Sequence, residues 1–233
     1  MRKRQLRKNS LTILCFLLSA LVLCSGYMVW KNLHAQKMDN SNFEQLQQIV
    51  EDNRKDTFES PDDEAKEPTE KKRNIQPILL QNGDCIGWLC IPNTNINYPV
   101  MHTPNEPQKY LRLNFDKKYS SSGVPFLDYR CSEETNLIIY GHNMKNGTMF
   151  SDLKKYLDSS FLNTHKIIEL ETADGVCYFE IVEVIKCDNT SEIYNNITVT
   201  ETRELMLSTC YGSSKKGRLV IRAKEINKGV EIC

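Results

Sequence analysis

An uncharged stretch of twenty residues, Leu11 to Trp30, constrains this chain more than any other feature. As a helix rising 1.5 Å per residue it would be about 30 Å long, the thickness of a bilayer's hydrocarbon core. Residues 1–10 carry five basic side chains and no acid, and such flanks stay on the cytoplasmic side. The sequence therefore predicts a cytoplasmic tail at 1–10, a transmembrane anchor at 11–30 and a later part outside the cell membrane.

Removal of this stretch as a signal peptide is the alternative. The apolar run continues past Ser25-Gly26 to Trp30, and no small-x-small cleavage site stands before the next charge. A lipoprotein signal ending at Cys24 would need a small residue where the bulky Leu23 stands. We therefore expect an anchor that is not cleaved.

Residues 31–74 are expected to form a stalk and linker. Phe43, Leu46 and Val50 recur at helical spacing, which predicts a weak amphipathic helix over 42–58, either solvated or docked on the following domain. Residues 59–73 hold two prolines and ten charged side chains, a composition that cannot bury apolar area. The remaining residues, 75–233, are enough for one domain with a single core.

The charge of the chain argues against nucleic acid as a partner. Without the first ten residues the chain holds 25 basic and 30 acidic side chains, a net charge of −5. No basic stripe with interleaved aromatic residues is present, as nucleic-acid-binding surfaces usually require.

From Cys85 onward the pattern is typical of β-structure. Short apolar runs at 86–91 and 136–140 are bounded by polar or turn residues, and Ala173-Asp174-Gly175 separates two further runs as a hairpin turn would. Residues 203–210 and 217–226 predict a second antiparallel pair. One helical face is predicted between the run at 136–140 and the hairpin turn at 173–175, formed by Met149, Phe150, Leu153, Tyr156 and Leu157. Many short strands with few helices favour a closed β-barrel.

Three side chains could supply the chemistry of a cysteine acyl-transferase. Cys210 ends one predicted strand, Arg218 begins the next, and His142 follows the apolar run that ends at Tyr140. A thiolate nucleophile, an acid/base and a cation for the oxyanion are the parts that such a reaction needs. Arg222 competes with Arg218, because strand alternation places both on one face.

The sequence motifs around these residues resemble those of a class B sortase, and the resemblance extends from about Ile86 to Ile226. They are Tyr-Gly-His-Asn-Met at 140–144, Gly-Thr-Met-Phe at 147–150, Leu-Ser-Thr-Cys at 207–210 and Gly-Arg-Leu-Val-Ile at 217–221. The resemblance implies an eight-stranded β-barrel, a membrane-anchored transpeptidase on a Gram-positive cell, and Arg218 rather than Arg222 as the oxyanion donor. Cys210 would form a thioester with the threonine of a sorting signal, and His142 would move the protons.

The resemblance also implies the partners. They are surface proteins with a carboxyl-terminal signal of the Asn-Pro-x-Thr-(Asn/Gly) kind and a peptidoglycan amine as acceptor. Leu111 matches an apolar substrate contact, and Ser208 and Thr209 are expected to line the groove. We expect Asp128 to make local hydrogen bonds rather than to orient His142. No cofactor and no metal are expected, because Cys85 and Cys90 lack a second ligand pair.

One segment departs from the family. Class B sortases usually carry a long helical insertion before the strand that ends in the cysteine. The corresponding segment here, residues 188–202, has only fifteen residues. We expect Ile193 and Tyr194 to replace the missing wall of the groove. The alternatives to a transpeptidase are a cysteine hydrolase of similar fold and a catalytically silent binding module.

Overall fold

The computed structural model describes residues 2–55, 75–132 and 134–226. The linker predicted at 59–73 and the last three residues of the helix predicted at 42–58 lie outside the described residues. The chain divides into two compact units, Met1–Ser41 and Asn42–Cys233.

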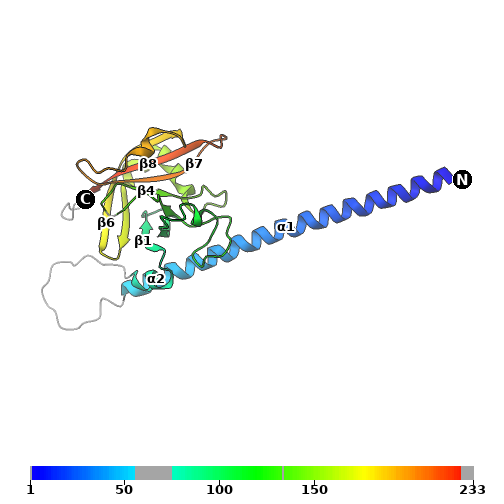
Figure 1. Ribbon diagram of the computed structural model, residues 1–233, viewed down its shortest axis with the longest axis horizontal. Helices are drawn as coiled ribbons and strands as arrows, with labels where there is room; N and C mark the ends of the chain where they lie inside the picture. The colour runs from blue at the N-terminus through cyan, green and yellow to red at the C-terminus, as the bar shows by residue number, and fades with distance from the viewer. Residues whose placement is uncertain (1, 56–74, 133, 227–233) are drawn as a thin grey trace. The chain divides into compact units, whose positions relative to one another are not determined.

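The first unit is the amino-terminal part of helix α1, which runs from Arg2 to Lys55 (Figure 1). Within residues 13–52 of this helix, an apolar window of 18 residues has a mean hydropathy of 2.2, and none of its residues is buried in the protein. By length and composition this helix is able to cross a membrane. No proline or glycine interrupts residues 31–55, which explains why one helix continues where the sequence predicted a separate shorter one.

The carboxyl-terminal part of α1 belongs to the second unit and packs on its barrel. Phe43, Leu46 and Val50 are each at least 93% buried. The Phe43 ring meets Tyr98 edge to face at a centroid distance of 5.3 Å, and the Gln47 amide donates to the Asn97 carbonyl at 2.8 Å. This part of the helix is therefore docked, one of the two alternatives that the sequence left open.

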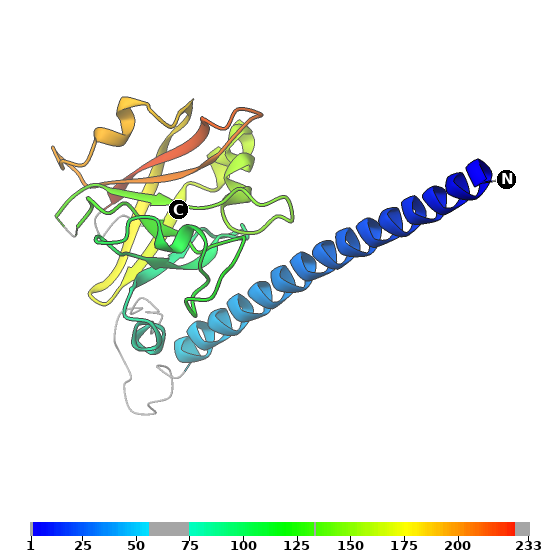
Figure 2. The same cartoon turned by 45° about the vertical axis from the view of Figure 1, so that its right-hand side comes forward.

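Eight strands close into a barrel in the order β1-β2-β3-β4-β7-β8-β6-β5 (Figures 1 and 2). Neighbouring strands are antiparallel except for two parallel pairs, β2 with β3 and β4 with β7. The strands are β1 Cys85–Cys90, β2 Asn97–Met101, β3 Phe126–Leu127, β4 Leu137–Tyr140, β5 Ile167–Thr172, β6 Gly175–Asp188, β7 Glu204–Cys210 and β8 Gly217–Ile226. The predicted closed barrel is confirmed.

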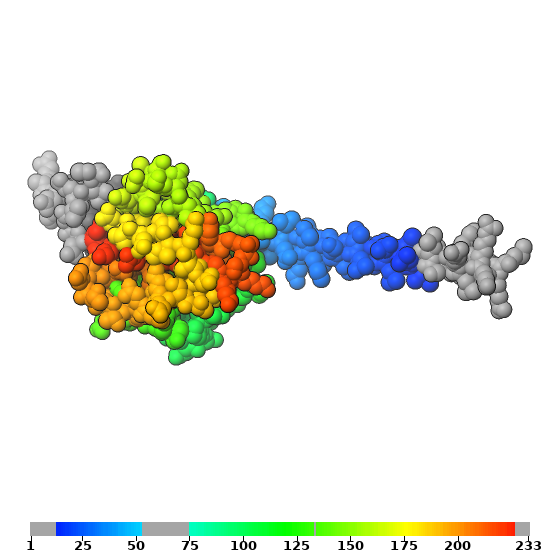
Figure 3. All heavy atoms as spheres, turned by 90° about the horizontal axis from the view of Figure 1, so that it is seen from above, coloured from blue at the N-terminus to red at the C-terminus, as the bar shows by residue number. Residues whose placement is uncertain are grey.

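The long strands follow the local signals in the sequence. Gly175 adopts a φ of +137° at the turn between β5 and β6, a conformation open to glycine. Strand β7 is buried at every residue except Cys210, and the middle of β8 is buried as well. In Figure 3 the yellow to red residues of the carboxyl-terminal part of the chain, which includes β6, β7 and β8, cover much of the visible face of the barrel unit. Burial is complete for the side chains of Leu205, Leu207 and Ile221, so this sheet contributes much of the core.

The helices of the barrel unit are short. They are α2 Gln76–Gln81, α3 Ser159–Thr164 and three 3₁₀ turns, η2 Lys109–Leu111, η3 Phe150–Leu157 and η4 Glu192–Asn195. The helical face predicted around Met149 needs one correction, because η3 has three residues per turn. That period buries Phe150, Leu153 and Tyr156 together and leaves Leu157 39% exposed.

Candidate active site

The thiol and the imidazole leave the barrel at the same rim. Strands β4 and β7 are parallel neighbours with Tyr140 opposite Ser208, so the residues that follow each strand emerge side by side. The Thr209 hydroxyl donates to the Gly141 carbonyl at 2.7 Å, and the Asn143 amide donates to the Cys210 carbonyl at 2.8 Å. These bonds fix the backbone of Cys210 beside that of His142.

Arg218 reaches the same place from the third strand. It is the register partner of Cys210 in the antiparallel pair β7–β8, and directly opposed residues project from the same face. Its Nη1 donates to the carbonyls of Lys215 at 3.0 Å and Gly217 at 2.9 Å. The competing Arg222 instead pairs with Glu183 at 2.7 Å, so the structure places Arg218 next to the thiol.

The solvent exposure of Cys210 distinguishes it from the three buried cysteines of the barrel unit. Cys210 is exposed, whereas Cys85, Cys90 and Cys131 are buried. Burial raises the pKa of Cys85 to about 11 and raises that of Cys131 as well. Buried thiols of this kind stay protonated and pack as small apolar groups. Among these four, only Cys210 is open to an incoming substrate.

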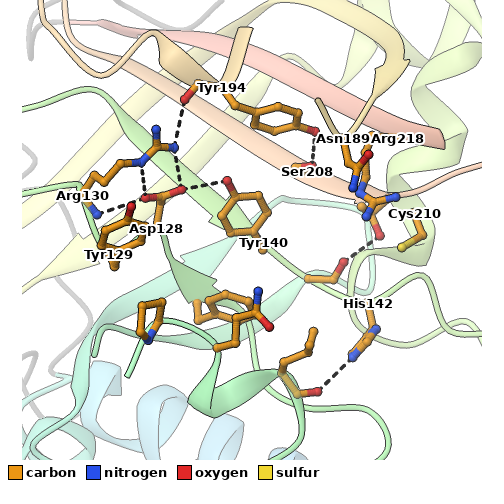
Figure 4. Close-up of a pocket in the computed structure, with 16 residues that line it drawn as sticks. Asp128, Tyr129, Arg130, Tyr140, His142, Asn189, Tyr194, Ser208, Cys210 and Arg218 are labelled. Carbon is orange, nitrogen blue, oxygen red and sulfur yellow. Dashed lines mark hydrogen bonds and ion pairs between the residues drawn. The ribbon is translucent and has the colours of Figure 1, made fainter. Parts of the chain in front are cut away.

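His142 is oriented by a backbone carbonyl. Its Nε2 lies 3.0 Å from the Leu111 oxygen, as the dashed line in Figure 4 shows. A carbonyl can only accept, so Nε2 carries the proton and Nδ1 is left as the unprotonated nitrogen. No hydrogen bond joins this ring to Cys210 among the described residues, a looseness common before substrate binds.

The loop that presents the Leu111 carbonyl is anchored in the core. Tyr110 is fully buried, its hydroxyl donates to Asp84 at 2.8 Å, and it accepts from Asn82 at 2.9 Å. Gly123 has a φ of +60°, and a Cβ there would lie 2.5 Å from the Tyr110 carbonyl oxygen. The sequence predicted that the Leu111 side chain would contact substrate. The bond from its backbone carbonyl to His142 could not be predicted, because every residue type has such a carbonyl.

These residues surround one pocket of about 430 Å³ (Figure 4). Six other predicted or discussed residues line it beside Cys210 and His142: Leu111, Asp128, Tyr194, Ser208, Thr209 and Arg218. Ile193 is not among the lining residues and packs against the core. Sequence reasoning gave no role to Arg130 or Tyr140, which also line the pocket.

Comparison with known proteins decides the family of this chain. The model of the sortase domain matches residues 89–226, more than half of the chain and all the residues at the rim of the barrel. The chain belongs to the sortase family. Sortases are cysteine transpeptidases, so the enzyme class predicted from the sequence is confirmed.

Within the sortases the likeness is to class B. Sortase B of Listeria monocytogenes is 31% identical over 68% of this chain and 76% of its own length. Among solved structures, a Staphylococcus aureus sortase B–substrate complex is 25% identical, covers 83% of this chain and 98% of its own, and superposes with a TM-score of 0.67. A sortase B complexed with triglycine is 25% identical with a TM-score of 0.70, covering 83% of this chain and 99% of its own. The class B prediction is confirmed.

The far end of the sortase pocket holds a polar network. The Arg130 guanidinium donates through Nε and Nη2 to the two oxygens of Asp128, each at 2.9 Å. The Tyr140 hydroxyl donates to the same carboxylate at 2.8 Å. Burial raises the pKa of Asp128, but the bonds from Arg130 and Tyr140 outweigh it, and the net shift is downward. Asp128 therefore makes local bonds, and it does not touch His142.

Proposed function

We propose that Cys210, His142 and Arg218 are the nucleophile, the proton carrier and the oxyanion donor of this sortase. The supporting observation is their convergence from three strands onto one rim, with Cys210 opposite Arg218 in the register. The exposed thiol and the shared pocket give a peptide carbonyl access to all three. Proximity of this kind lowers the entropic cost of the reaction.

The first half-reaction forms a thioester. The Cys210 thiolate attacks the carbonyl carbon of the threonine in the sorting signal, a C–S bond forms, and the amide C–N bond breaks. When the thiolate forms, the His142 Nδ1 takes the proton of the Cys210 thiol, and it then passes this proton to the leaving amine while Nε2 keeps its bond to the Leu111 oxygen. The thioester conserves the acyl group for transfer, so no cofactor is required.

Arg218 is suited to hold the tetrahedral oxyanion. Its two hydrogen bonds both use Nη1, so Nε and Nη2 remain as donors within the described part of the chain. A guanidinium stays charged at any pH that the enzyme meets. Donors that are held in place before the reaction stabilise the oxyanion without reorganisation. One such donor typically contributes about 3 kcal/mol to the stabilisation of the transition state.

In the second half-reaction an amine replaces the thiol. The incoming amine gives its proton to His142, attacks the thioester carbon and releases the Cys210 thiolate as the new amide forms. We propose a peptidoglycan amine as this acceptor and a signal of the Asn-Pro-x-Thr-(Asn/Gly) kind as donor. The related sortase B structures contain a substrate and triglycine, which supports a peptide donor and an amine acceptor.

The pocket walls are proposed to contact the sorting signal. Leu111, Ser208, Thr209 and Tyr194 line the cavity, and Ile193, which lies in the same turn as Tyr194 and packs against the core, would support this wall. The apolar stretch of α1 would anchor the enzyme in the membrane. With residues 1–10 in the cytoplasm, the barrel would face the cell wall, where both substrates lie.

The test uses the full-length chain in detergent micelles with a panel of sorting-signal peptides and triglycine, followed by mass spectrometry. We expect a thioester adduct on Cys210 and a product in which the threonine carboxyl is joined to triglycine. Cys210→Ala should give neither, and Cys177→Ala, a half-buried cysteine outside the pocket, should give both. Transfer that persists in Cys210→Ala would refute the assignment, and release of free acid alone would refute the amine acceptor.

A further inference from the structure

One wall of the pocket is a short turn that has little support of its own. It lies between β6 and β7, contains η4 Glu192–Asn195 and presents Tyr194 to the cavity. Tyr194 is 9% exposed although it stands in a connecting segment. A turn of this length needs contacts from elsewhere to hold a buried aromatic ring in one position.

Arg130 supplies such a contact on the pocket side. Its Nη2 donates to the Tyr194 carbonyl at 3.0 Å while the same guanidinium holds Asp128 through two bonds. Asp128 is only 6% exposed and also accepts from Tyr140. The fork of the guanidinium therefore connects a buried carboxylate to the backbone of the wall, as Figure 4 shows.

The hydrogen bonds of Arg130 and Tyr194 form part of a closed ring of contacts. The Tyr194 hydroxyl and the Ser208 hydroxyl share a hydrogen bond of 2.8 Å, and Ser208 is the register partner of Tyr140. From Tyr140 the path returns through Asp128 and Arg130 to the Tyr194 carbonyl. The wall is thus tied to the strand that precedes His142 and to the strand that carries Cys210.

The rest of the turn is fixed by an asparagine away from the pocket. The Asn136 amide donates to the carbonyls of Asn196 at 3.3 Å and Thr198 at 3.0 Å, and its backbone N–H donates to Ile197 at 2.8 Å. Asn136 does not line the pocket. It holds the carboxyl-terminal half of the turn, whereas Arg130 holds the half that faces the substrate.

We propose that Arg130 is a positioning residue that holds the Tyr194 wall in its peptide-binding position. The inference rests on the proposed function, since it takes this pocket as the site of the sorting signal. Arg130 acts on the wall and not on the reacting atoms, which lie at the other end of the cavity. Its loss should therefore weaken peptide binding and leave the chemical steps in place.

The kinetic test compares Arg130→Met with Arg222→Met in the full-length enzyme. The two arginine side chains have the same exposed fraction, 33%, and each is paired with a carboxylate, but only Arg130 lines the pocket. We expect Arg130→Met to raise KM for the peptide about tenfold with kcat within about twofold. Arg222→Met should leave both unchanged. A fall in kcat at constant KM would overturn the proposal.

A lysine variant separates charge from geometry. Arg130→Lys keeps a cation beside Asp128, but an ammonium is a point charge without the planar fork. We expect it to fold as the wild type does and still to show a KM raised about fivefold. Full recovery of KM by lysine would refute the bridging role, because charge alone would then suffice.

A second measurement needs no substrate and so separates this proposal from the proposed function. Amide hydrogen exchange by mass spectrometry should show residues 190–198 exchanging about tenfold faster in Arg130→Met than in the wild type and in Arg222→Met. Unchanged exchange would overturn the positioning role of Arg130 even if the thioester chemistry is confirmed. Faster exchange would support it even if Cys210 forms no thioester with the peptides tried.

Discussion

At the reactive end of the pocket His142 and Arg218 donate to backbone carbonyls, whereas at the far end Asp128, Arg130 and Tyr140 bond to one another. The first arrangement leaves the functional atoms free: the Cys210 thiol is exposed and the His142 Nδ1 is unengaged among the described residues. The second arrangement binds both oxygens of the Asp128 carboxylate.

This contrast separates groups that must stay free to exchange bonds from groups that must keep a wall of the pocket in shape. Reacting groups must exchange bonds with a substrate, so their places are set by strand register and by neighbouring carbonyls. The wall that is proposed to bind the peptide must keep its shape, and its polar groups accordingly bond to one another. Substitutions at the two ends should therefore act on different kinetic and thermodynamic quantities.

The largest effect is expected at the reactive end. Arg218→Lys should lower kcat for acylation by a factor of about 10² to 10³, because an ammonium cannot reproduce the donors aimed at the oxyanion. Quenched-flow detection of the thioester measures this rate. Arg222→Lys is the matched control on the same strand, and an equal loss there would contradict the assignment of Arg218.

A smaller effect is expected where the backbone orients the imidazole. Gly123→Ala places a Cβ against the Tyr110 and Leu111 carbonyls at positive φ, so the acceptor of the His142 bond must shift. We expect kcat to fall about tenfold, with the Nε2-protonated tautomer less populated in ¹⁵N NMR of the histidine ring. Gly83→Ala, which has nothing within 4 Å of the added atom, should behave as the wild type does, and an unchanged tautomer in Gly123→Ala would refute the carbonyl's role.

At the far end the expected effect is on stability. Asp128→Asn should cost about 2 kcal/mol at pH 7, which lowers Tm by about 5 °C in a domain of this size. The pKa of Asp128 is lowered in the folded state, so its contribution is present at neutral pH and is lost as pH falls below about 4. The Tm difference between wild type and variant should therefore shrink in acid.

Calorimetry between pH 7 and pH 3 measures this difference. Asp116→Asn is the control, because its pair with Lys118 spans 3.9 Å at an exposed site and such pairs contribute little. A Tm difference for Asp128→Asn that grew in acid would contradict the stated direction of the pKa shift.

The smallest effect is expected from Tyr194→Phe. The change removes the hydrogen bond to Ser208 and keeps the ring, so we expect a loss of about 1 kcal/mol and a KM increase of about threefold. Burial raises the pKa of Tyr194 to about 12, so the hydroxyl is neutral and the effect should be constant from pH 6 to pH 9. Tyr119→Phe, at a side chain 76% exposed, should change neither quantity.

Much of this architecture was predictable because its signals are local. The hairpin turn at Gly175 and the apolar runs of β1, β4, β7 and β8 are read within a few residues. Strands β2 and β3 are different: Pro99 interrupts the first, and the second has two residues. Pairing with the neighbouring strands β1 and β4, rather than a pattern of their own, defines them.

The site divides in the same way. Residue type and strand position nominated Cys210, His142 and either Arg218 or Arg222, and the family resemblance selected Arg218. The structure brings Cys210, His142 and Arg218 to one pocket, while their roles remain a prediction. The Leu111 carbonyl could not be nominated, because every residue has one. The bond from Arg130 to the Tyr194 carbonyl joins positions 64 apart, and no pattern in either segment indicates it.

The parallel pairing of β4 with β7 also decides when this enzyme becomes active. Gly141 and Thr209, which join the two strands at the rim, are 68 positions apart, so the thiol and the imidazole meet only after a large loop has closed. Contacts of such high sequence separation form slowly in β-rich domains. A newly made chain therefore carries a separated cysteine and histidine, and the two side chains share one pocket only once the barrel has closed.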